Sequence, residues 1–355
     1  MIPNQPIIHD DFDGLIDNSG EAEKPSDQDL WFLPSPMEEE PDYLGSGIRA
    51  ESVEMSIITD WTQAEAALVA RLARVAGRLG ALDERLLRGP EGWRHRLALL
   101  EAVDLSWFAG DRVSPDRLAL WVALRLSGAQ EDTSALARVG WAVRRLSDGP
   151  GPEASLADFL DRRDAENNAD DTERFTDHAD DWLNLMKTAS HLHPITRACL
   201  GFHLWALAGL GQHGDRMEAA VTAGRIAASE AKGAVFAPVA MGGAVGLRGG
   251  GTPAERLARW LDGMDSACLS AMRHLDDIEV WSKRAEIVMA VLSGRTPPGL
   301  RAALTEWPLV SAPMAEKLSG ASRAAVQRNL AWMEAHGLIR EVTGQGRFRM
   351  WRISS

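Results

Sequence analysis

Apolar residues recur every three or four positions along most of the chain from Trp61 onward. Leu68, Leu72, Val75 and Leu79 form the first such stripe, and this spacing places them on one face of an α-helix. Comparable patterns predict further helices at Trp93–Ala109, Asp116–Leu126, Ser134–Leu146, Arg174–Ala189, Ile195–Ala208, Asp215–Ser229, Ala254–Leu261 and Ile278–Leu292. Runs of alternating β-branched residues do not occur before residue 338, so we expect the larger part of the chain to be all α.

Local signals mark where these helices should begin and end. Ser114 followed by Pro115 is typical of a helix start, because serine caps the first turn and proline fits the first helical position. Glycine commonly follows the last residue of a helix. It stands where four of these helices are expected to end, at Gly80, Gly110, Gly128 and Gly294.

Tryptophan is unusually frequent, with 13 residues against one tyrosine. Many of these rings fall on the predicted helices: Trp93, Trp107, Trp121, Trp141, Trp182, Trp205, Trp260 and Trp281. A base-stacking platform would instead gather aromatic rings beside basic residues on one face. We therefore expect these tryptophans to pack between helices in the core.

The pattern changes after residue 299 and predicts a smaller unit. A short helix at Leu300–Leu304 is followed by a second at Ala312–Leu318. After a turn at Ser319–Ala321, a third helix is expected to begin at the cap Ser322 and to run to His336. Two short helices joined by a tight, glycine-containing turn form a helix-turn-helix.

The third of these helices is predicted to have two different faces. Val326, Leu330 and Met333 share one stripe and should face the core. The residues turned outward are small or polar: Arg323, Ala324, Gln327, Arg328 and Ala331. A cation such as Arg323 in the first turn is disfavoured by the helix dipole, so a phosphate or a guanine edge would compensate for its position.

An extended pattern follows Gly337 and predicts a β-hairpin. Its strands are Leu338–Val342 and Arg347–Ile353, joined by the glycine-bearing loop Thr343–Gly346. Alternation along the second strand places Arg347 and Arg349 on one face, where they would meet phosphates, and Phe348 and Met350 on the other. The predicted fold class is therefore mainly α, with a helical domain followed by a small α+β winged helix-turn-helix.

Composition divides the chain into three parts. Residues 1–60 are rich in acids and proline, and we expect them to be mobile apart from one apolar island, Leu30–Leu33, which would dock on the rest of the chain or on a partner. Residues 61–293 form the all-α domain. The turn-rich stretch Leu292–Gly299 marks a boundary, and residues 300–355 form the winged helix-turn-helix.

Charge supports this division. The chain has a net charge of −13, but residues 1–60 hold 15 acidic and 2 basic side chains, whereas residues 300–355 hold 8 basic and 4 acidic ones. Because local charge governs contact with a polyanion, the acidic total does not argue against DNA binding. The chain shows no secretory signal and no apolar run of membrane-spanning length, so we expect a cytoplasmic protein without a membrane partner.

No catalytic or metal-binding pattern stands out. Cys199 and Cys268 lie apart within predicted helices, and Pro194 separates His191 and His193 from His203, so we expect neither a zinc site nor another metal site. The glycine-rich stretch 242–251 lacks the lysine and hydroxyl residue of a P-loop, and a flexible connector is the expected structure. We expect no cofactor and no enzyme activity.

One enzymatic alternative starts from His193–Arg197. The opening His-Pro and the closing arginine resemble part of the signature of Fic-type nucleotidyl transferases, which are helical and often end in a winged module. The acid, glycine and asparagine of that signature are missing between them. A degenerate Fic-like transferase therefore remains a third hypothesis, after DNA binding and a protein-interaction scaffold.

The C-terminal stretches Ser311–Leu330, Gly337–Glu341 and Thr343–Phe348 resemble a helix-turn-helix family of unknown function that is frequent on plasmids of plant-associated alphaproteobacteria. Trp93–Leu124 and Leu257–Leu292 are similar to its uncharacterised central domain. The resemblance covers residues 61–355 and implies DNA binding without a known reaction.

These patterns together predict a sequence-specific protein that binds double-stranded DNA, as a transcriptional or plasmid-associated regulator. The residues predicted to bind DNA are Ser322, Arg323, Gln327, Arg328, Arg347, Arg349 and Arg352. Those on the third helix would read bases, and those on the hairpin would contact the backbone. We expect the helical domain to form a homodimer or to bind a small-molecule or protein effector. The alternative is a protein-interaction scaffold whose winged helix does not meet DNA.

Overall fold

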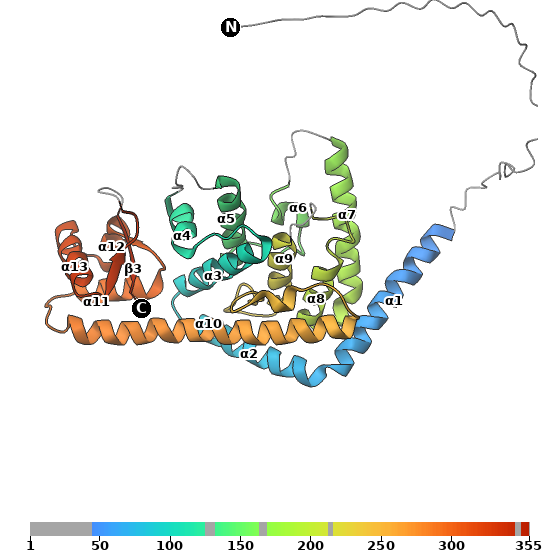
Figure 1. Cartoon of the computed structure of the whole chain (residues 1–355), viewed down its shortest axis with the longest axis horizontal. Helices are drawn as coiled ribbons and strands as arrows, with labels where there is room; N and C mark the ends of the chain where they lie inside the picture. Colours follow the sequence, from blue (N-terminus) through green and yellow to red (C-terminus); the bar gives the residue numbers. More distant parts are fainter. Residues whose placement is uncertain (1–44, 125–131, 163–168, 212–215, 345–348, 355) are drawn as a thin grey trace, which may run out of the picture. The chain divides into compact units, whose positions relative to one another are not determined.

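A computed structural model of the chain describes residues 45–124, 132–162, 169–211, 216–344 and 349–354. Over these ranges the protein is mainly helical, with thirteen α-helices and one small antiparallel sheet near the C-terminus (Figure 1). The mainly α prediction is thus confirmed. Residues 52–355 form one compact unit. Within the described residues, no helix combines the length and the apolar character needed to cross a bilayer.

The first helix begins earlier than the sequence pattern indicated. Helix α1 spans Gly45–Ala67, so part of the stretch predicted as a mobile leader is helical. Ile58, Trp61 and Ala64 are buried at intervals of three residues, which anchors the end of α1 in the core. The apolar island Leu30–Leu33 lies outside the described residues.

Helix α2 spans Val69–Arg88 and buries the apolar stripe that the sequence predicted. It continues through Gly80, so the prediction that this glycine ends a helix was wrong. Leu82 and Leu86 extend the buried stripe beyond it, and α2 packs along α10 (Pro253–Met289). This packing outweighs the penalty of a glycine inside a helix, which is about 1 kcal/mol.

We call helices α2 to α10 the helical bundle. Seven of them lie between α2 and α10 in the chain: α3 (Gly92–Ala109), α4 (Pro115–Leu124), α5 (Thr133–Ser147), α6 (Leu156–Phe159), α7 (Ala169–Thr188), α8 (Pro194–Leu204) and α9 (Met217–Ala227). Helix α3 packs against α5, and α8 packs against α9. Several of the predicted tryptophans are buried among the helices, as the edge-to-face pair Trp182 and Trp205 shows at a ring separation of 5.3 Å. Trp107 is an exception, because 57% of its surface is exposed.

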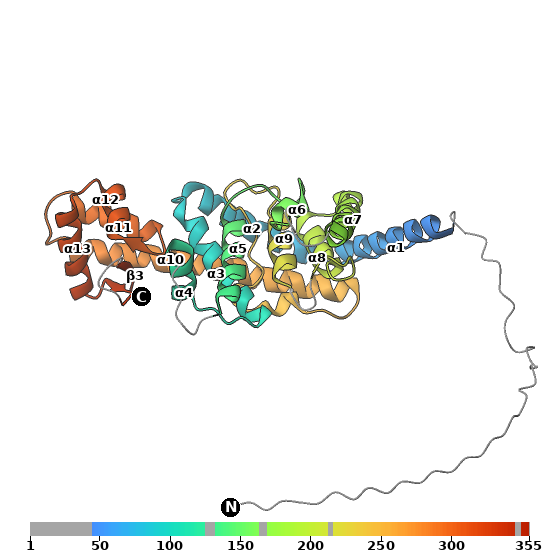
Figure 2. The same ribbon diagram turned by 90° about the horizontal axis from the view of Figure 1, so that it is seen from above.

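Helix α10 is a single element of 37 residues, where the sequence pattern had predicted two separate helices. The residues that join them are buried but small or sulfur-containing: Met264, Ala267, Cys268 and Ala271. Its start is fixed by a capping box in which Thr252 and Glu255 bond each other's backbone amides. Figures 1 and 2 show α10 extending from the helical bundle to the last part of the chain.

Part of the glycine-rich stretch packs against the bundle, because Gly246 and Leu247 are buried whereas most of its other residues are exposed. Gly246 lies in a 3₁₀ turn (Ala244–Leu247) against α10, where its backbone meets Gly263. A Cβ at Gly263 would lie 2.9 Å from Gly246 Cα, so a side chain at Gly263 would collide with the backbone of the turn. The preceding segment is held by Glu101, whose carboxylate accepts hydrogen bonds from the amides of residues 239–241 at 2.8–2.9 Å.

The last part of the chain, residues 296–354, forms a unit that we call the C-terminal module. Its elements are α11 (Thr296–Glu306), β1 (Val310–Ser311), α12 (Ala312–Ser319), α13 (Arg323–Ala335), β2 (Ile339–Glu341) and β3 (Met350–Ile353). All strand pairs are antiparallel and the order is β1-β3-β2, with Val310 opposite Trp351 and Ile339 opposite Ile353. Strand β1 was not predicted, because its two residues become a strand only by pairing with β3.

The module shares its core with α10. Leu300, Leu304, Val326, Leu330 and Met333 are all fully buried, as the stripes on their helices indicated. The same cluster contains three residues from the end of α10: Trp281, Ala285 and Met289. The indole of Trp281 also donates a hydrogen bond of 2.8 Å to the carbonyl of Leu338. Residues before the predicted boundary therefore complete the module's core.

Candidate nucleic-acid interface

Helices α12 and α13 are set by local signals that the sequence displays. The hydroxyl of Ser311 accepts a hydrogen bond from the amide of Met314 at 3.3 Å and caps α12. Gly320 ends α12 with a left-handed backbone, at a φ of +63°. The hydroxyl of Ser322 then accepts from the amide of Ala325 at 3.4 Å and caps α13. The tight turn between the helices results from these three residues.

Helix α13 separates a buried face from an exposed one as predicted. Val326, Leu330 and Met333 have no exposed surface. Four of the residues predicted to bind DNA are exposed on this helix or at its cap: Ser322, Arg323, Gln327 and Arg328. Within the described residues, neither Arg323 nor Arg328 forms an ion pair or a side-chain hydrogen bond. The structure thus brings two uncompensated guanidinium groups together on one helix.

The exposed face of α13 also carries small side chains. Ala324 and Ala331 are exposed between the longer residues, and short side chains allow close approach of a flat or grooved partner. Lys317 and Leu318 of α12 are exposed nearby in the chain. The face is therefore polar and basic with few bulky groups.

The arginines of the hairpin are not equivalent. Arg347 lies outside the described residues. Arg349 forms an ion pair with Glu334 of α13 at 3.1 Å, and its guanidinium lies 5.0 Å from the centre of the Trp351 ring. Its side chain keeps 43% of its surface exposed. Arg349 is thus at the surface with a carboxylate already compensating its charge.

Arg352 does not join the exposed arginines. Its guanidinium forms an ion pair with Asp116 at the start of α4, and Arg340 of β2 bonds the other oxygen of the same carboxylate at 2.6 Å. Both arginines therefore attach the strands of the module to the helical bundle. We leave Arg352 out of the candidate interface, although the sequence pattern had grouped it with Arg347 and Arg349.

A buried arginine makes a second connection between the bundle and the module. Arg96 of α3 is 5% exposed, and its guanidinium donates to the carbonyls of Leu304, Glu306 and Trp307, with a distance of 2.9 Å to Glu306. These groups belong to the last turn of α11 and the residue after it, where helix carbonyls have no partner within the helix. Burial, together with the positive charge of Arg352, lowers the pKa of Arg96 to about 9.

Sequence reasoning missed these connections. Arg96 lies 208 to 211 positions before its acceptors, and Asp116 lies 236 positions before Arg352. Arg96 follows Arg94 and His95 directly in α3, so no local signal singled it out. The pairing itself requires the tertiary fold.

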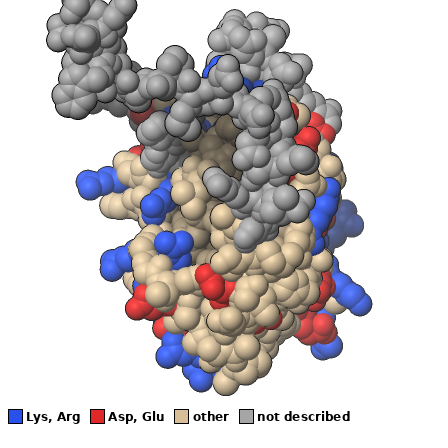
Figure 3. All heavy atoms as spheres, turned by 90° about the vertical axis from the view of Figure 1, so that its right-hand side faces the viewer, with Lys and Arg blue, Asp and Glu red and all other residues tan. Residues whose placement is uncertain are grey.

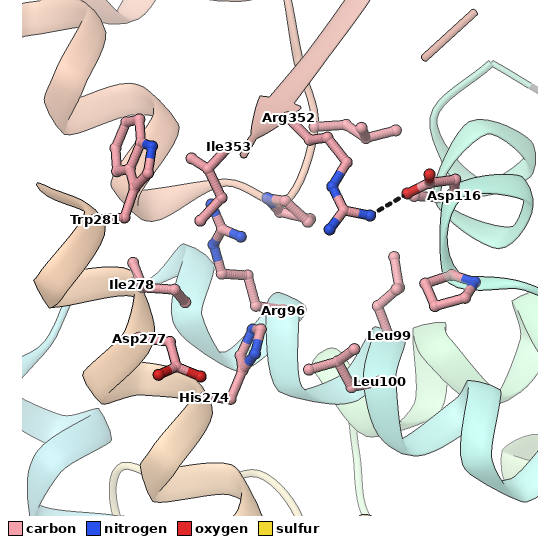
Figure 4. A pocket seen from close by; sticks show the side chains of 14 residues that line it. Arg96, Leu99, Leu100, Asp116, His274, Asp277, Ile278, Trp281, Arg352 and Ile353 are labelled. Atoms are coloured by element: carbon pink, nitrogen blue, oxygen red, sulfur yellow. Dashed lines mark hydrogen bonds and ion pairs between the residues drawn. The ribbon is translucent and has the colours of Figure 1, made fainter. Parts of the chain in front are cut away.

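A cavity of about 250 Å³ lies where these connections meet. Its walls come from α3, α4 and α10 on the bundle side and from residues 308–309 and β3 on the module side. Figure 4 shows Arg96 and Arg352 entering it from opposite sides, with His274 of α10 beside Arg96. Burial and the charges of Arg96 and Arg352 lower the pKa of His274 to about 4, against an opposing effect of Asp277. This imidazole is therefore neutral at pH 7.

The other candidate residues serve the fold. His193 Nδ1 accepts the amide of Ile195 at 3.1 Å and caps α8, and Arg197 forms an ion pair with Glu153 at 2.9 Å. His191 Nε2 lies 3.0 Å from the hydroxyl of Thr62, and His203 packs against Trp61. Among the described residues, no three metal-binding side chains gather into one group.

The distribution of charge on the face drawn in Figure 3 can be compared with that on α13. This face is at the side of the molecule on which α1 and α7 lie, and basic and acidic side chains are interspersed over it. Mixed charge of this kind is ordinary for a protein surface. The unpaired arginines of α13 are the more distinctive feature.

No family model matches this chain, and no curated protein matches it either. The resemblance to a plasmid-associated family therefore stays an expectation from the sequence. Function is accordingly inferred from the geometry of the described residues.

Proposed function

We propose that the C-terminal module is a winged helix-turn-helix that binds double-stranded DNA through α13. The order α11-β1-α12-α13-β2-β3, with β3 between the other strands, agrees with this assignment. In such modules the second helix of the pair enters the major groove, and the hairpin between the last strands lies beside it. The tip of this hairpin, residues 345–348, is outside the described residues.

The observation that carries the proposal is the exposed face of α13. Arg323 and Arg328 are exposed without an ion pair among the described residues, and Gln327 lies between them. Arginine bonds the O6 and N7 atoms of guanine, and glutamine bonds adenine, so this set is suited to the base edges of a major groove. Ala324 and Ala331 leave room for the helix to approach the groove floor.

Arg349 would act differently from the residues of α13. Its position on the hairpin suits a phosphate contact, and a phosphate would replace Glu334 as its anionic partner. Such an exchange gives less affinity than a free arginine would, because one ion pair is lost as another forms. Arg347 would also contact a phosphate and so add to affinity without affecting sequence preference.

Selection from a random pool of duplexes tests this proposal. The full chain should retain a defined set of sequences, and the Arg328→Ala variant should relax the preference at one position of that set, at about 1–3 kcal/mol of discrimination. Arg349→Ala should weaken binding to all sequences alike. A matched control is Arg74→Ala, because Arg74 is an exposed arginine of α2 in the bundle.

Two results of this selection would contradict the proposal. A full chain that retains no duplex above background removes the proposal. Retention that Arg328→Ala and Arg74→Ala alter equally would place the DNA contact elsewhere than on α13.

A protein-interaction module is the second candidate, and one observation favours it. Two of the three arginines predicted to meet the DNA backbone, Arg349 and Arg352, are already compensated by Glu334 and Asp116. A module whose cations are internally paired has less attraction for a polyanion. In that case α13 would bind an acidic protein surface, and the duplex selection would return nothing.

A further inference from the structure

Polar and apolar side chains both line the cavity between the bundle and the module. Figure 4 shows Arg352 and Asp116 on one side of it and Arg96, His274 and Asp277 on another. Most of the other lining side chains are apolar, and they include Leu99, Leu100, Ile278, Trp281 and Ile353. This combination of an apolar wall with a few convergent polar groups is typical of small-molecule sites.

Arg96 has bonding capacity that the protein leaves unused. Its Nε and Nη2 atoms donate to backbone carbonyls, whereas Nη1 has no hydrogen-bond partner among the described residues. Nη1 is not one of the fully buried side-chain atoms that lack a partner, so it keeps accessible surface and water can bond it in the free protein. A ligand in the cavity would replace this water as its acceptor.

The charges around the cavity also favour an anion. Arg352 and Arg340 share the single carboxylate of Asp116, and Arg96 bonds only neutral carbonyls. The cavity lining therefore holds two guanidinium groups and the carboxylate of Asp116, and Arg96 is the one of the two arginines that no carboxylate bonds among the described residues. Asp277 also lines the cavity, next to His274, but its side chain is exposed and forms no ion pair with these arginines among the described residues.

We propose that this cavity binds a small organic monocarboxylate, with its carboxylate between Arg96 and Arg352 and its hydrocarbon body against Leu99, Leu100, Ile278 and Trp281. A volume of about 250 Å³ is below the range of roughly 300–1,000 Å³ usual for drug-sized ligands. The ligand is therefore of the size of one ring or a short alkyl chain. The neutral imidazole of His274 would bond a hydroxyl or a second oxygen of the ligand.

Ligand binding at this site would affect the contacts of the C-terminal module through Arg352. This residue belongs to β3, whereas Asp116, its partner in the free protein, belongs to α4 of the bundle. A ligand carboxylate would compete with Asp116 for the same guanidinium and so weaken one tie between the bundle and the strands. By linkage, any change that the ligand makes in DNA affinity is matched by an equal change that DNA makes in ligand affinity. This last step rests on the proposed function, whereas ligand binding does not.

The test uses the full chain with benzoate, cyclohexanecarboxylate and hexanoate as probes. Benzamide and benzyl alcohol are the uncharged comparisons, and phosphate and chloride are the inorganic ones. Calorimetry and thermal unfolding should show saturable binding of at least one carboxylate, and at least tenfold weaker binding of the uncharged compounds, because a charge-assisted bond is lost.

Two variants change the lining of the cavity. Arg352→Gln should weaken carboxylate binding at least tenfold, and Leu100→Phe should block it by filling part of the volume. Arg74→Gln, which removes an exposed arginine far along the chain, should leave the affinity unchanged. Arg96 is not substituted for this purpose, because its bonds to α11 support the fold.

Several results would overturn the proposal. One is the absence of saturable binding for all three carboxylates. Another is carboxylate binding that both cavity variants leave intact. The third is equal binding of phosphate or chloride, which would show an inorganic anion site. DNA affinity is then measured with and without the probe. Ligand binding by a chain that binds no DNA would refute the proposed function alone, and DNA binding by a chain that takes up no carboxylate would refute only this inference.

Discussion

Replacing Arg96 by methionine isolates the connection between α3 and the end of α11. Methionine keeps an unbranched, apolar stem of similar length, so it retains much of the packing while it removes every hydrogen-bond donor. In the native protein these donors satisfy the carbonyls of Leu304, Glu306 and Trp307. The substitution leaves all three carbonyls without their charged partner.

The size of the effect depends on how many acceptors lose their partner. Hydrogen bonds to a charged group contribute about 1.5–3 kcal/mol each, and burial of an unsatisfied acceptor costs about 1–3 kcal/mol. Three acceptors are affected, but Glu306 and Trp307 are only partly buried, so water can reach some of them. The expected loss of unfolding free energy is therefore about 3–5 kcal/mol, which is large for one substitution.

Urea unfolding followed by tryptophan fluorescence measures this loss. Trp93, which donates to the carbonyl of Thr305 at 3.3 Å, is one of the 13 tryptophans that contribute to this signal, so the signal follows unfolding of the whole chain. Arg94→Met is the matched control, because Arg94 is a half-buried arginine two residues away that forms no ion pair among the described residues. It should change the unfolding free energy by less than about 1 kcal/mol. If both variants lose the same small amount, Arg96 does not hold the module as described.

Two further predictions concern the bundle and the cavity. Gly263→Ala should destabilise the protein by about 1–3 kcal/mol, because its Cβ would meet the backbone of Gly246. Gly80→Ala has open space around the new Cβ and should stabilise α2 by up to about 1 kcal/mol. Thermal unfolding of both variants tests these opposite signs. His274 has its pKa lowered to about 4 from 6.5, so the stability that it contributes is present above pH 6.5 and is lost as the pH falls toward 4. His274→Phe should therefore flatten the decline of the urea midpoint over that pH interval, and an unchanged decline would show that His274 is not the group that titrates. Part of the decline should remain, because burial also lowers the pKa of His203 to about 4.

Much of the helical structure was legible from the sequence because its signals are local. The stripe of Val326, Leu330 and Met333 and the caps Ser311 and Ser322 depend on neighbours three or four residues away. The continuity of α10 was missed because Ala267, Cys268 and Ala271 are small and do not form a pronounced apolar stripe, although they are buried. Strand β1 was missed because only its pairing with β3 makes it a strand.

The candidate site was predictable only in part, for the same reason. The exposure of Arg323, Gln327 and Arg328 is expected from helical periodicity, and the structure places them accordingly. The alternation that places Arg349 on one face of the second strand places Arg352 on the other, and this distinguishes the two. The ion pair of Arg352 with Asp116, which is far away in the chain, has no local signal. The cavity likewise needs walls from five separate segments and has no signature in the sequence.

The salt dependence of binding to a random-sequence duplex tests the central claim most directly. Fluorescence anisotropy of a labelled duplex with the full chain should show affinity falling steeply between about 50 and 200 mM salt, with a log–log slope of roughly −3 or steeper. On a random-sequence duplex the arginines of α13 act as cations and not as readers of matched bases. The double variant Arg323→Ala, Arg328→Ala should therefore weaken binding and make this slope less steep, while Arg74→Ala should leave it unchanged. Absent binding, or an affinity that salt does not change, would contradict the account.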